Sequence, residues 1–269
     1  MSGPRAGRRF AAMGIGFALW IVACASPAAA QEPVGYWAFD ACTGVDSSAN
    51  AKDMTVNGAP VCGPAAFGNG YTLNGSSDYM EHASDPVFTP GGRPWSIVAW
   101  VRTTTTDPSF FVAVGWYRCG ANPGCTASDP DLYDMGVNGR QAYFQIRDDA
   151  GQDAQLQDST MIADGNWHLL VGTNNPGVHT PRLYVDGVLK VEALNGVSTL
   201  VTGDIPIPLS IGRQFRQGWG SPGNYFPGSI DEVRIYDVEL TPGQVAKLYT
   251  NNNTPTHPIT WGAIKSSYR

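Results

Sequence analysis

Short runs of alternating apolar and polar residues recur along the chain, separated by turn residues. The clearest are Pro94–Arg102 and Phe110–Tyr117, where apolar side chains occupy both faces. A period of two predicts β-strands, and strands that are apolar on both sides are covered on both sides. We expect further strands at Val34–Asp40, Trp167–Gly172 and Ser229–Asp237. In the second of these, Trp167, Leu169 and Val171 are expected to face inward.

Turn signals join several of these runs. Asn138-Gly139 and Asp186-Gly187 each lie between two apolar runs and predict tight hairpins. Asn74–Ser77 separates two more runs and predicts a third hairpin. By contrast, residues 148–158 are polar and are expected to be mostly loop.

The run Ser229–Asp237 contains an unusual carboxylate. Strict alternation places Asp231 on the same face as Val233 and Ile235, with Arg234 on the opposite face. A carboxylate in line with a core face is costly unless it is neutralised or hydrogen-bonded. Asp231 is therefore the most informative acid in the sequence.

One short helix is predicted after this strand. Thr241 fits the N-cap, Pro242 the first helical position and Gln244 the partner in a capping box. The expected buried stripe of this helix is Val245, Leu248 and Tyr249. A strand followed by a capped helix near the end of the chain also suggests that this last strand lies inside its sheet.

Composition agrees with a strand-rich fold. The chain has 269 residues, with 32 Gly, 20 Pro and 15% charged residues, which suits many turns around a real core. The prediction is an all-β, two-sheet antiparallel sandwich with one short C-terminal helix, formed by residues 31–250. Residues 251–269 are expected to be a flexible tail.

Residues 1–30 have the features of a secretory signal. Three arginines precede the apolar run Phe10–Ala23, and Ala28–Ala30 forms an A-x-A cleavage site. The segment Ile21–Cys24 also resembles a lipobox, in which Cys24 would carry a lipid anchor; cleavage after Ala30 is favoured. The chain without this segment has 14 basic and 23 acidic residues, a net charge of −9. We therefore expect a secreted, periplasmic or cell-surface protein with no transmembrane span and no nucleic-acid partner.

Four cysteines remain after this cleavage, an even number that favours disulfides in an exported chain. Three pairings are open. Cys42–Cys62 and Cys119–Cys125 are favoured because each closes a short loop. A zinc site is disfavoured because the spacings differ from those of zinc motifs.

Seven segments resemble, in order, the LamG-like jelly roll of the laminin-G/concanavalin A-like lectin–glucanase superfamily. They are YWAFD with DSSAN, YTLNGSSDYME, WSIVAWVR, NWHLLVGT, LYVDGVL, LSIGR and FPGSIDEVRIYDVELTPGQV, within residues 34–250. The resemblance implies a concanavalin A-like jelly roll of a secreted bacterial type. It also implies a structural calcium ion, since such domains often carry one.

Two sites are proposed from these residues. The candidate calcium ligands are Asp40, Asp46, Asn50 and Asp231, because calcium takes several oxygen ligands from loop carboxylates and amides. The alternative is that these residues only make turns and accept backbone hydrogen bonds. The candidate glycan-binding residues are five aromatic side chains in or beside loops: Trp116, Tyr117, Trp219, Tyr225 and Phe226. For each ring the alternative is core packing.

Catalysis is not expected. The densest acids, Asp148, Asp149 and Asp153, lie in a polar segment, and the paired-acid motif of the glucanase relatives is missing. His168 follows Trp167 and is interpreted as a half-buried strand residue. The preferred function is a non-catalytic recognition domain that binds a glycan or an extracellular protein. The alternatives are a polysaccharide hydrolase or lyase on the same fold, and a purely structural surface protein.

Overall fold

The computed structural model describes residue 3 and residues 31–114, 116–117, 133–147, 153–178, 180–193, 207–217 and 223–250. The predicted signal segment, Cys24, the Cys119–Cys125 pair and the tail at 251–269 lie outside these residues, apart from Gly3. No helix among the described residues is long and apolar enough to cross a membrane.

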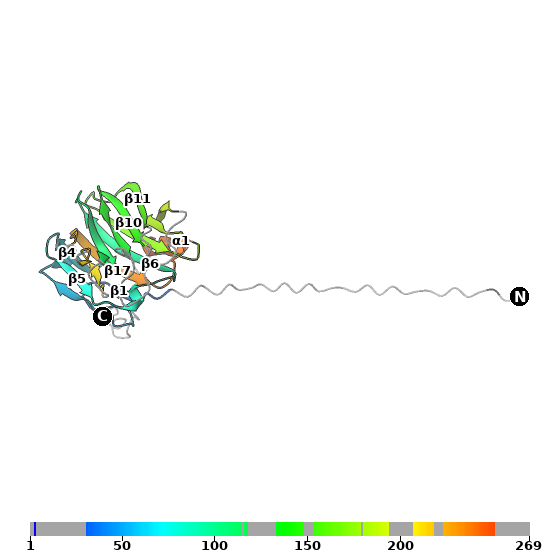
Figure 1. Cartoon of the computed structure of the whole chain (residues 1–269), viewed down its shortest axis with the longest axis horizontal. Helices are drawn as coiled ribbons and strands as arrows, with labels where there is room; N and C mark the ends of the chain where they lie inside the picture. The colour runs from blue at the N-terminus through cyan, green and yellow to red at the C-terminus, as the bar shows by residue number, and fades with distance from the viewer. Residues whose placement is uncertain are drawn as a thin grey trace, which may run out of the picture. The chain divides into compact units, whose positions relative to one another are not determined.

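The first of two large sheets has eight strands. In spatial order they are β14 (Val188–Glu192), β13 (Arg182–Val185), β12 (Trp167–Asn174), β6 (Trp95–Thr103), β17 (Pro227–Tyr236), β4 (Asn69–Asn74) and β3 (Val61–Pro64), with β1 (Gly35–Trp37) also paired to β17. Strand β17, the last described strand, thus lies inside the sheet, as predicted, and pairs with the first described strand, β1 (Figure 1).

The second sheet has seven strands. In spatial order they are β11 (Asp153–Met161), β10 (Gln141–Arg147), β9 (Tyr133–Asn138), β7 (Ser109–Val114), β15 (Leu209–Ile211), β5 (Tyr79–His82) and β2 (Thr55–Asn57). The remaining elements are the parallel pair β8 (Trp116–Tyr117) and β16 (Arg216–Gln217), the 3-10 helix η1 (Pro86–Phe88) and the helix α1 (Pro242–Thr250). Neighbouring strands in both large sheets are antiparallel, which confirms the predicted jelly-roll sandwich.

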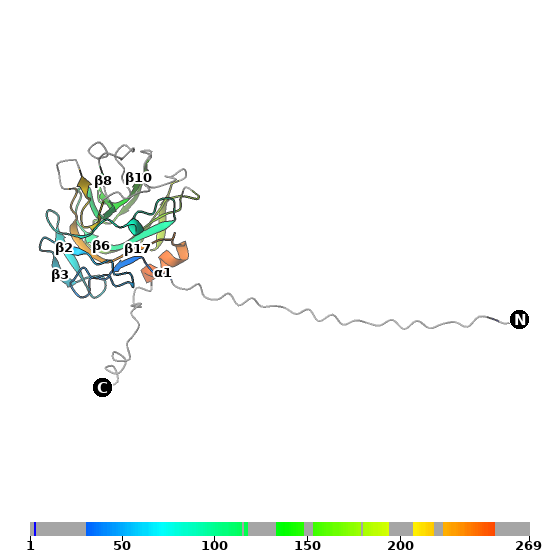
Figure 2. The same ribbon diagram turned by 60° about the horizontal axis from the view of Figure 1, so that its bottom comes forward.

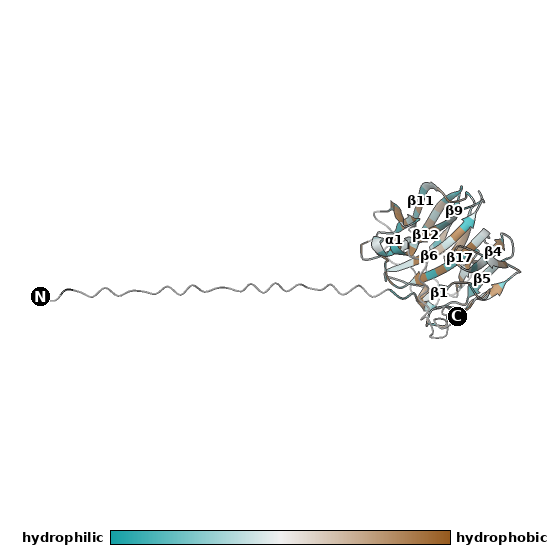
Figure 3. Ribbon diagram, turned by 180° about the vertical axis from the view of Figure 1, so that it is seen from behind, coloured by the Kyte–Doolittle hydropathy of each residue, from teal (hydrophilic) through white to brown (hydrophobic). Residues whose placement is uncertain are grey.

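The main core lies between the two sheets. Strand β6 sends Trp95, Ile97, Ala99 and Val101 into it, where Trp95 packs on Tyr133 with ring centroids 4.6 Å apart. On its other face, Val98 and Trp100 belong to a smaller core that includes Val245 of α1. Figure 3 shows the ribbon coloured by the hydropathy of each residue, with β6 and α1 labelled. The prediction that this strand is covered on both faces is confirmed.

Strand β12 contributes to both cores, but the face that was expected to point inward lies on the outer side of the sheet. Leu170 lies in the main core between the sheets. Leu169 and Val171, predicted to face inward, pack in the smaller core under α1 with Trp167.

A β-bulge in β17 overturns the predicted face of Asp231. Asp231 is opposite Trp100 and Arg234 is opposite Val98, so two residues, Glu232 and Val233, oppose one on β6. Glu232 has a φ of 55°, the left-handed conformation that such a bulge requires. Asp231 consequently shares the outer face with Trp100 and points away from the main core.

The helix α1 begins as predicted. The Thr241 backbone N–H donates to Gln244 Oε1 at 2.8 Å, and the Gln244 N–H donates to Thr241 Oγ1 at 3.3 Å, which is a capping box. Val245 is buried. Tyr249 was expected to be buried but is 42% exposed, with one ring face stacked on Trp100.

Two of the three predicted hairpins are confirmed. Strands β13 and β14 turn at Asp186-Gly187, where both residues have positive φ. Strands β9 and β10 turn at Gly139-Arg140, one residue beyond the expected pair.

The third predicted hairpin is wrong, because β4 and β5 belong to different sheets. Asn74 Oδ1 accepts backbone N–H groups from Ser76, Ser77 and Asp78, so the segment crosses between sheets as a side-chain-stabilised turn. The polar stretch 148–158, expected to be mostly loop, overlaps the nine-residue edge strand β11. Its alternating exposed and buried positions explain its high polarity.

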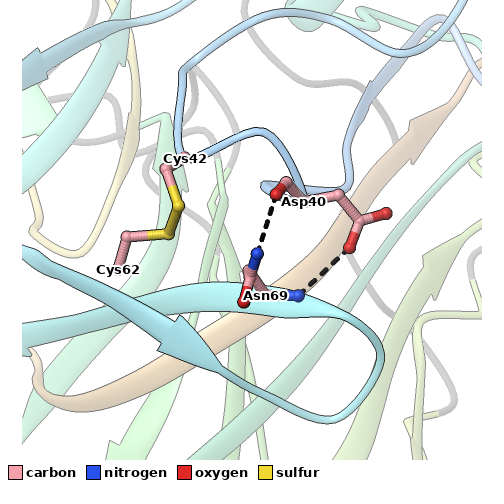
Figure 4. The surroundings of a disulfide bond; sticks show 4 residues. All are labelled: Asp40, Cys42, Cys62 and Asn69. Atoms are coloured by element: carbon pink, nitrogen blue, oxygen red, sulfur yellow. Dashed lines mark hydrogen bonds between the residues drawn. A yellow bond between two sulfur atoms is a disulfide. The ribbon is translucent and has the colours of Figure 1, made fainter.

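The predicted disulfide Cys42–Cys62 is present, with a Cα–Cα distance of 5.7 Å. It links the segment after β1 to edge strand β3 (Figure 4). A disulfide across a loop of this size stabilises a fold by about 3 kcal/mol, mainly by restricting the unfolded chain.

His168 connects the β13–β14 turn to the rest of the eight-stranded sheet. Its Nδ1 lies 2.8 Å from Asp186 Oδ2, and its Nε2 lies 3.1 Å from Asp164 Oδ1. Asp186 also accepts the Leu169 N–H at 3.0 Å. The hydrogen bond to Asp186, and then the one to Asp164, raise the pKa of His168 above its ordinary value.

We therefore expect a pH-dependent contribution of His168 to stability. A raised folded-state pKa makes this contribution complete below the unfolded value of 6.5, and it is lost as the pH rises through the higher folded value. His168→Gln should cost about 1 kcal/mol at about pH 5.5 and less at about pH 8.5, measured by urea unfolding. His82→Gln is the control, because His82 Nδ1 lies 2.6 Å from a backbone carbonyl oxygen, whereas both ring nitrogens of His168 lie beside carboxylates. Equal losses for His168→Gln at both pH values would contradict the assignment.

Candidate ligand-binding face

One row of side chains crosses the outer face of the seven-stranded sheet. The strand registers align one residue from every strand, and we call this set the polar row: Thr55, Glu81, Ser210, Ala113, Asp134, Gln145 and Gln155. Their neighbours along each strand, such as Met80, Ile211 and Phe144, lie in the main core. Alternation therefore turns the row away from the core.

The middle of this polar row is buried. Ser210 and Asp134 are fully buried and Gln145 is 6% exposed, whereas Thr55 and Gln155 at the two ends are exposed. Polar side chains on the outer face of a sheet normally meet water, and burying them requires hydrogen-bond partners. This sheet therefore carries a covered polar surface at its centre.

Aromatic rings flank the row. A bulge in β7 between Phe110 and Val112 puts Phe110 on the outer face, opposite Gly136. A side chain at Gly136 would collide with the Phe110 ring. The centroids of the Phe110 and Tyr143 rings are 6.1 Å apart. The Tyr143 hydroxyl in turn donates to Gln145 Oε1 at 2.9 Å.

The segment after β15 folds over this face. Gly212 has a φ of +91°, and a side chain there would meet the Leu73 side chain at 2.4 Å, so the chain can turn sharply only with glycine here. The turn carries Gln214 to Asp134, with Nε2 donating to Oδ2 at 2.5 Å. It also brings Arg213 to Glu81, with Nη2 at 2.5 Å from Oε2.

Of the predicted glycan-binding aromatics, Tyr225 is placed at this face. Its ring lies 6.1 Å from the ring of Tyr79, nearly edge-on, beside Arg213. Trp116 and Tyr117 form β8, directly after β7, and pair with β16 (Figure 2). Trp219 lies outside the described residues, and Phe226 is fully buried in the main core against Phe111, so its prediction as a ligand-binding ring is wrong. Glu81, Asp134, Gln145 and Arg213 were not predicted from the sequence, although Asp134 and Gln145, each between apolar neighbours in its strand, were a signal.

Both carboxylate oxygens of Asp46 accept hydrogen bonds from its own loop and from β1. Its Oδ1 accepts the backbone N–H groups of Tyr36 and Ser48 at 2.9 and 2.8 Å. Its Oδ2 accepts the Ser48 hydroxyl at 2.7 Å and the Lys52 N–H at 2.8 Å. Four donors occupy both oxygens, so Asp46 does not fit the role of a calcium ligand.

Asp40 and Asn50 make hydrogen bonds to different partners. Asp40 Oδ1 accepts the Asn69 backbone N–H at 3.1 Å, and its backbone carbonyl accepts the Asn69 side chain, while Oδ2 is turned away (Figure 4). Asn50 is exposed, and its Nδ2 donates to Pro33 O and Ser48 Oγ.

Asp231 is the unusual acid that its sequence position suggested. It is fully buried; Oδ2 accepts the Phe67 N–H at 2.9 Å, but Oδ1 has no hydrogen-bond partner. Burial first, and then the charges of Glu232 and Asp40, raise the pKa of Asp231 to about 8. Glu232, by contrast, pairs with Arg234 and accepts the Tyr36 hydroxyl.

Asp40 and Asp231 therefore fit a cation better than Asp46 or Asn50. The unpartnered Oδ1 of Asp231, close enough to Asp40 to feel its charge, is what a bound cation would satisfy. Within the described ranges, no three His, Cys, Asp or Glu side chains form a metal-binding group. An ion here would take most of its ligands from backbone carbonyls or water, which calcium accepts.

Of the acids considered for catalysis, Asp153 is the one that the structure describes. Asp153 starts the exposed edge strand β11 and accepts the Gln155 amide at 2.9 Å. Asp148 and Asp149 lie outside the described residues.

Comparison with known proteins agrees with this architecture. The family model of the concanavalin A-like lectin/glucanases superfamily matches residues 74–246. A comparison with curated protein sequences gives no match.

Solved structures show the same fold at low identity. Domain 4 of AbnA, an extracellular GH43 arabinanase from Geobacillus stearothermophilus, in complex with arabinotriose, is 20% identical with a TM-score of 0.57, covering 81% of this chain and 98% of that one. The binding domain of Paraclostridial Mosquitocidal Protein 1 is 14% identical with a TM-score of 0.64, covering 82% and 52%.

A structure of botulinum neurotoxin type C, described as depending on two ganglioside molecules for cell entry, is 13% identical with a TM-score of 0.61, covering 84% and 52%. This chain thus spans about half of each toxin structure. At these identities the similarity is one of fold, whereas the family model covers well over half of the sequence. The chain belongs to the concanavalin A-like lectin/glucanase superfamily.

Proposed function

We propose that this chain is a non-catalytic carbohydrate-binding domain whose ligand lies across the polar row of the seven-stranded sheet. The single observation that carries the proposal is the polar row itself, in which hydrogen-bonding side chains are aligned across one outer sheet face with the rings of Tyr143 and Tyr225 beside them. Hydroxyl-rich ligands are held by such a combination, since polar groups fix the hydroxyls and rings cover the apolar faces. The arabinotriose complex of the similar arabinanase domain supports a saccharide as the ligand class.

The spacing of the acids argues against a glycoside hydrolase on this face. Glu81 on β5 and Asp134 on β9 are the two acids of the polar row, and strands β15 and β7 separate them. Three strand spacings of about 4.8 Å place their backbones about 14 Å apart. Glycosidase carboxyl groups lie about 5 to 10 Å apart. Each acid is also already bonded, Glu81 to Arg213 and Asp134 to Gln214.

We propose that this domain acts outside the cytoplasm. The basic and apolar segment before Ala30 supports export, so the glycan would be met outside the cytoplasm.

We also propose that a structural calcium ion binds between Asp40 and Asp231. The support is the unpartnered buried oxygen of Asp231 and the nearby charge of Asp40. The ion would neutralise Asp231 and fasten β17 to the segment after β1. It would lie on the eight-stranded sheet and would take no part in glycan binding.

Loss of one hydrogen-bonding group from the centre of the row tests the proposed function. Wild type should bind at least one oligosaccharide on a glycan array, and Gln145→Leu should weaken that binding about tenfold by isothermal titration, since one lost hydrogen bond is worth about 1.4 kcal/mol. The reason is that leucine fills the space but cannot bond a hydroxyl.

Gln155→Leu is the matched control. Gln155 belongs to the same row but lies on exposed edge strand β11, so its loss should change affinity less than twofold. A wild-type protein that binds no glycan, or equal effects of the two variants, would overturn the proposal.

A further inference from the structure

One end of the polar row holds a half-exposed cluster of charge and aromatic rings. We call Tyr79, Glu81, Arg213 and Tyr225 the arginine cluster. The Arg213 guanidinium lies 3.6 Å from the centre of the Tyr79 ring, and its Nη2 donates to Glu81 Oε2 at 2.5 Å. Tyr225 packs edge-on against Tyr79 and shares a hydrogen bond with Arg213.

The positive charge of this cluster is already committed. The ring of Tyr79 covers one side of the guanidinium, Glu81 neutralises it, and the Arg213 side chain is only 13% exposed. A second ring, Phe215, lies 5.7 Å from the same guanidinium. Arg213 therefore acts as a fixed support for Glu81 and has little capacity to bind an incoming anion.

The accessible charge is the carboxylate. The Glu81 side chain is 28% exposed, and both described contacts of its carboxylate, from Arg213 and Ser210, use Oε2. Its Oε1 is left to accept hydrogen bonds from a ligand. Tyr225, half-buried beside it, offers an aromatic surface for a sugar ring.

We infer that the arginine cluster is the specificity-determining end of the glycan site and selects neutral sugars over sugars that carry a carboxylate. This inference rests on the proposed function. A hydroxyl of a neutral sugar donates to Glu81 Oε1 while its ring packs on Tyr225. A uronic or sialic acid places its carboxylate beside that of Glu81, with the charge of Arg213 already neutralised, and is repelled.

The test measures affinities for matched neutral and acidic sugars. The probes are trisaccharides of arabinose, galactose, mannose and glucose, the C6-oxidised uronic acid forms of the three hexose members, and lactose against sialyllactose. Wild type should prefer the neutral member of each bound pair at least tenfold. Glu81→Gln should reduce neutral-sugar affinity about tenfold and improve acidic-sugar affinity, because Arg213 is then left uncompensated.

Glu192→Gln is the control, because Glu192 also pairs with an arginine, Arg182, but on edge strand β14 of the other sheet. It should leave the neutral-to-acidic ratio unchanged. If Glu81→Gln does not fold, the wild-type ratio alone decides. Equal or tighter binding of the acidic sugars, or a ratio that Glu81→Gln leaves unchanged, overturns the inference. Absence of any glycan binding by wild type instead overturns the proposed function.

Discussion

Replacing Asp231 by asparagine should stabilise the calcium-free protein at alkaline pH. A folded-state pKa of about 8, against an ordinary 3.8, means that folding favours the protonated acid. The contribution of Asp231 is thus complete below about pH 4 and is lost as the pH rises to about 8, by up to about 5 kcal/mol. Asparagine keeps an acceptor for the Phe67 N–H and carries no charge. In urea unfolding with EGTA, Asp231→Asn should lose most of this slope and be more stable than wild type at about pH 8.

Asp237→Asn makes the same change of charge at an exposed position just after β17, and it should leave the slope in place. A wild-type stability that stays level between about pH 4 and pH 8, or an Asp231→Asn variant that is less stable than wild type in EGTA, would contradict the prediction.

Asp231→Asn should also differ from wild type in its response to calcium. A cation satisfies the lone Oδ1 of ionised Asp231, so millimolar calcium should raise the wild-type melting temperature at about pH 8. Asp231→Asn should not respond, and Asp40→Asn should respond weakly. Asp46→Asn should respond like wild type from a lower starting stability, because Asp46 bonds four donors in its own loop. Equal calcium responses in wild type and Asp231→Asn would remove the ion from this place.

Local chemistry determined the elements that could be predicted from sequence. Apolar alternation in β6, the capping box of α1 and the Asp186-Gly187 turn each depend on residues close together in the chain. Physical rules for periodicity, capping and turns apply directly to such short segments. The resemblance to the family added the concanavalin A-like jelly-roll arrangement, which no local rule supplies.

The failures arose where backbone geometry departs from the regular pattern. Strict alternation assigned Asp231 to the core face, but the left-handed Glu232 adds one residue to β17 and reverses the face. A bulge of this kind leaves no mark in a run of alternating residues. The turn at Asn74 has typical hairpin composition, yet the bonds to Asn74 Oδ1 let the chain pass to the other sheet.

The candidate site could not be predicted from the sequence for a different reason. Glu81, Ser210 and Asp134 are far apart in sequence and lie in three different strands. Their alignment depends on the order β5-β15-β7-β9 and on the register of every pair. Register across a sheet is a long-range property, so a single sequence cannot reveal that these residues form one row.

Removing the side chain of Trp37 should cost about 4 kcal/mol of unfolding free energy. Trp37 lies in β1, is fully buried in the main core and packs near Phe88, with ring centroids 6.0 Å apart. Its indole N–H donates to Lys52 O at 2.9 Å, which holds the loop after β1 against the strand. Strand β1 pairs only three residues with β17, so side-chain burial rather than ladder hydrogen bonding must keep it in place. Trp37→Ala leaves a large cavity at that junction.

Trp37→Phe separates the two contributions. Phenylalanine retains most of the buried ring but loses the bond to Lys52, so we expect a cost of about 1 to 2 kcal/mol by urea unfolding. Val61→Ala on edge strand β3 is the control for a side chain that is 67% exposed, and it should change stability by less than about 0.5 kcal/mol. If Trp37→Ala were no worse than Val61→Ala, the first strand would not be anchored by its core side chain. The fold would then depend at this junction on the Cys42–Cys62 bond instead, and reduction of that disulfide should unfold wild type at a lower urea concentration.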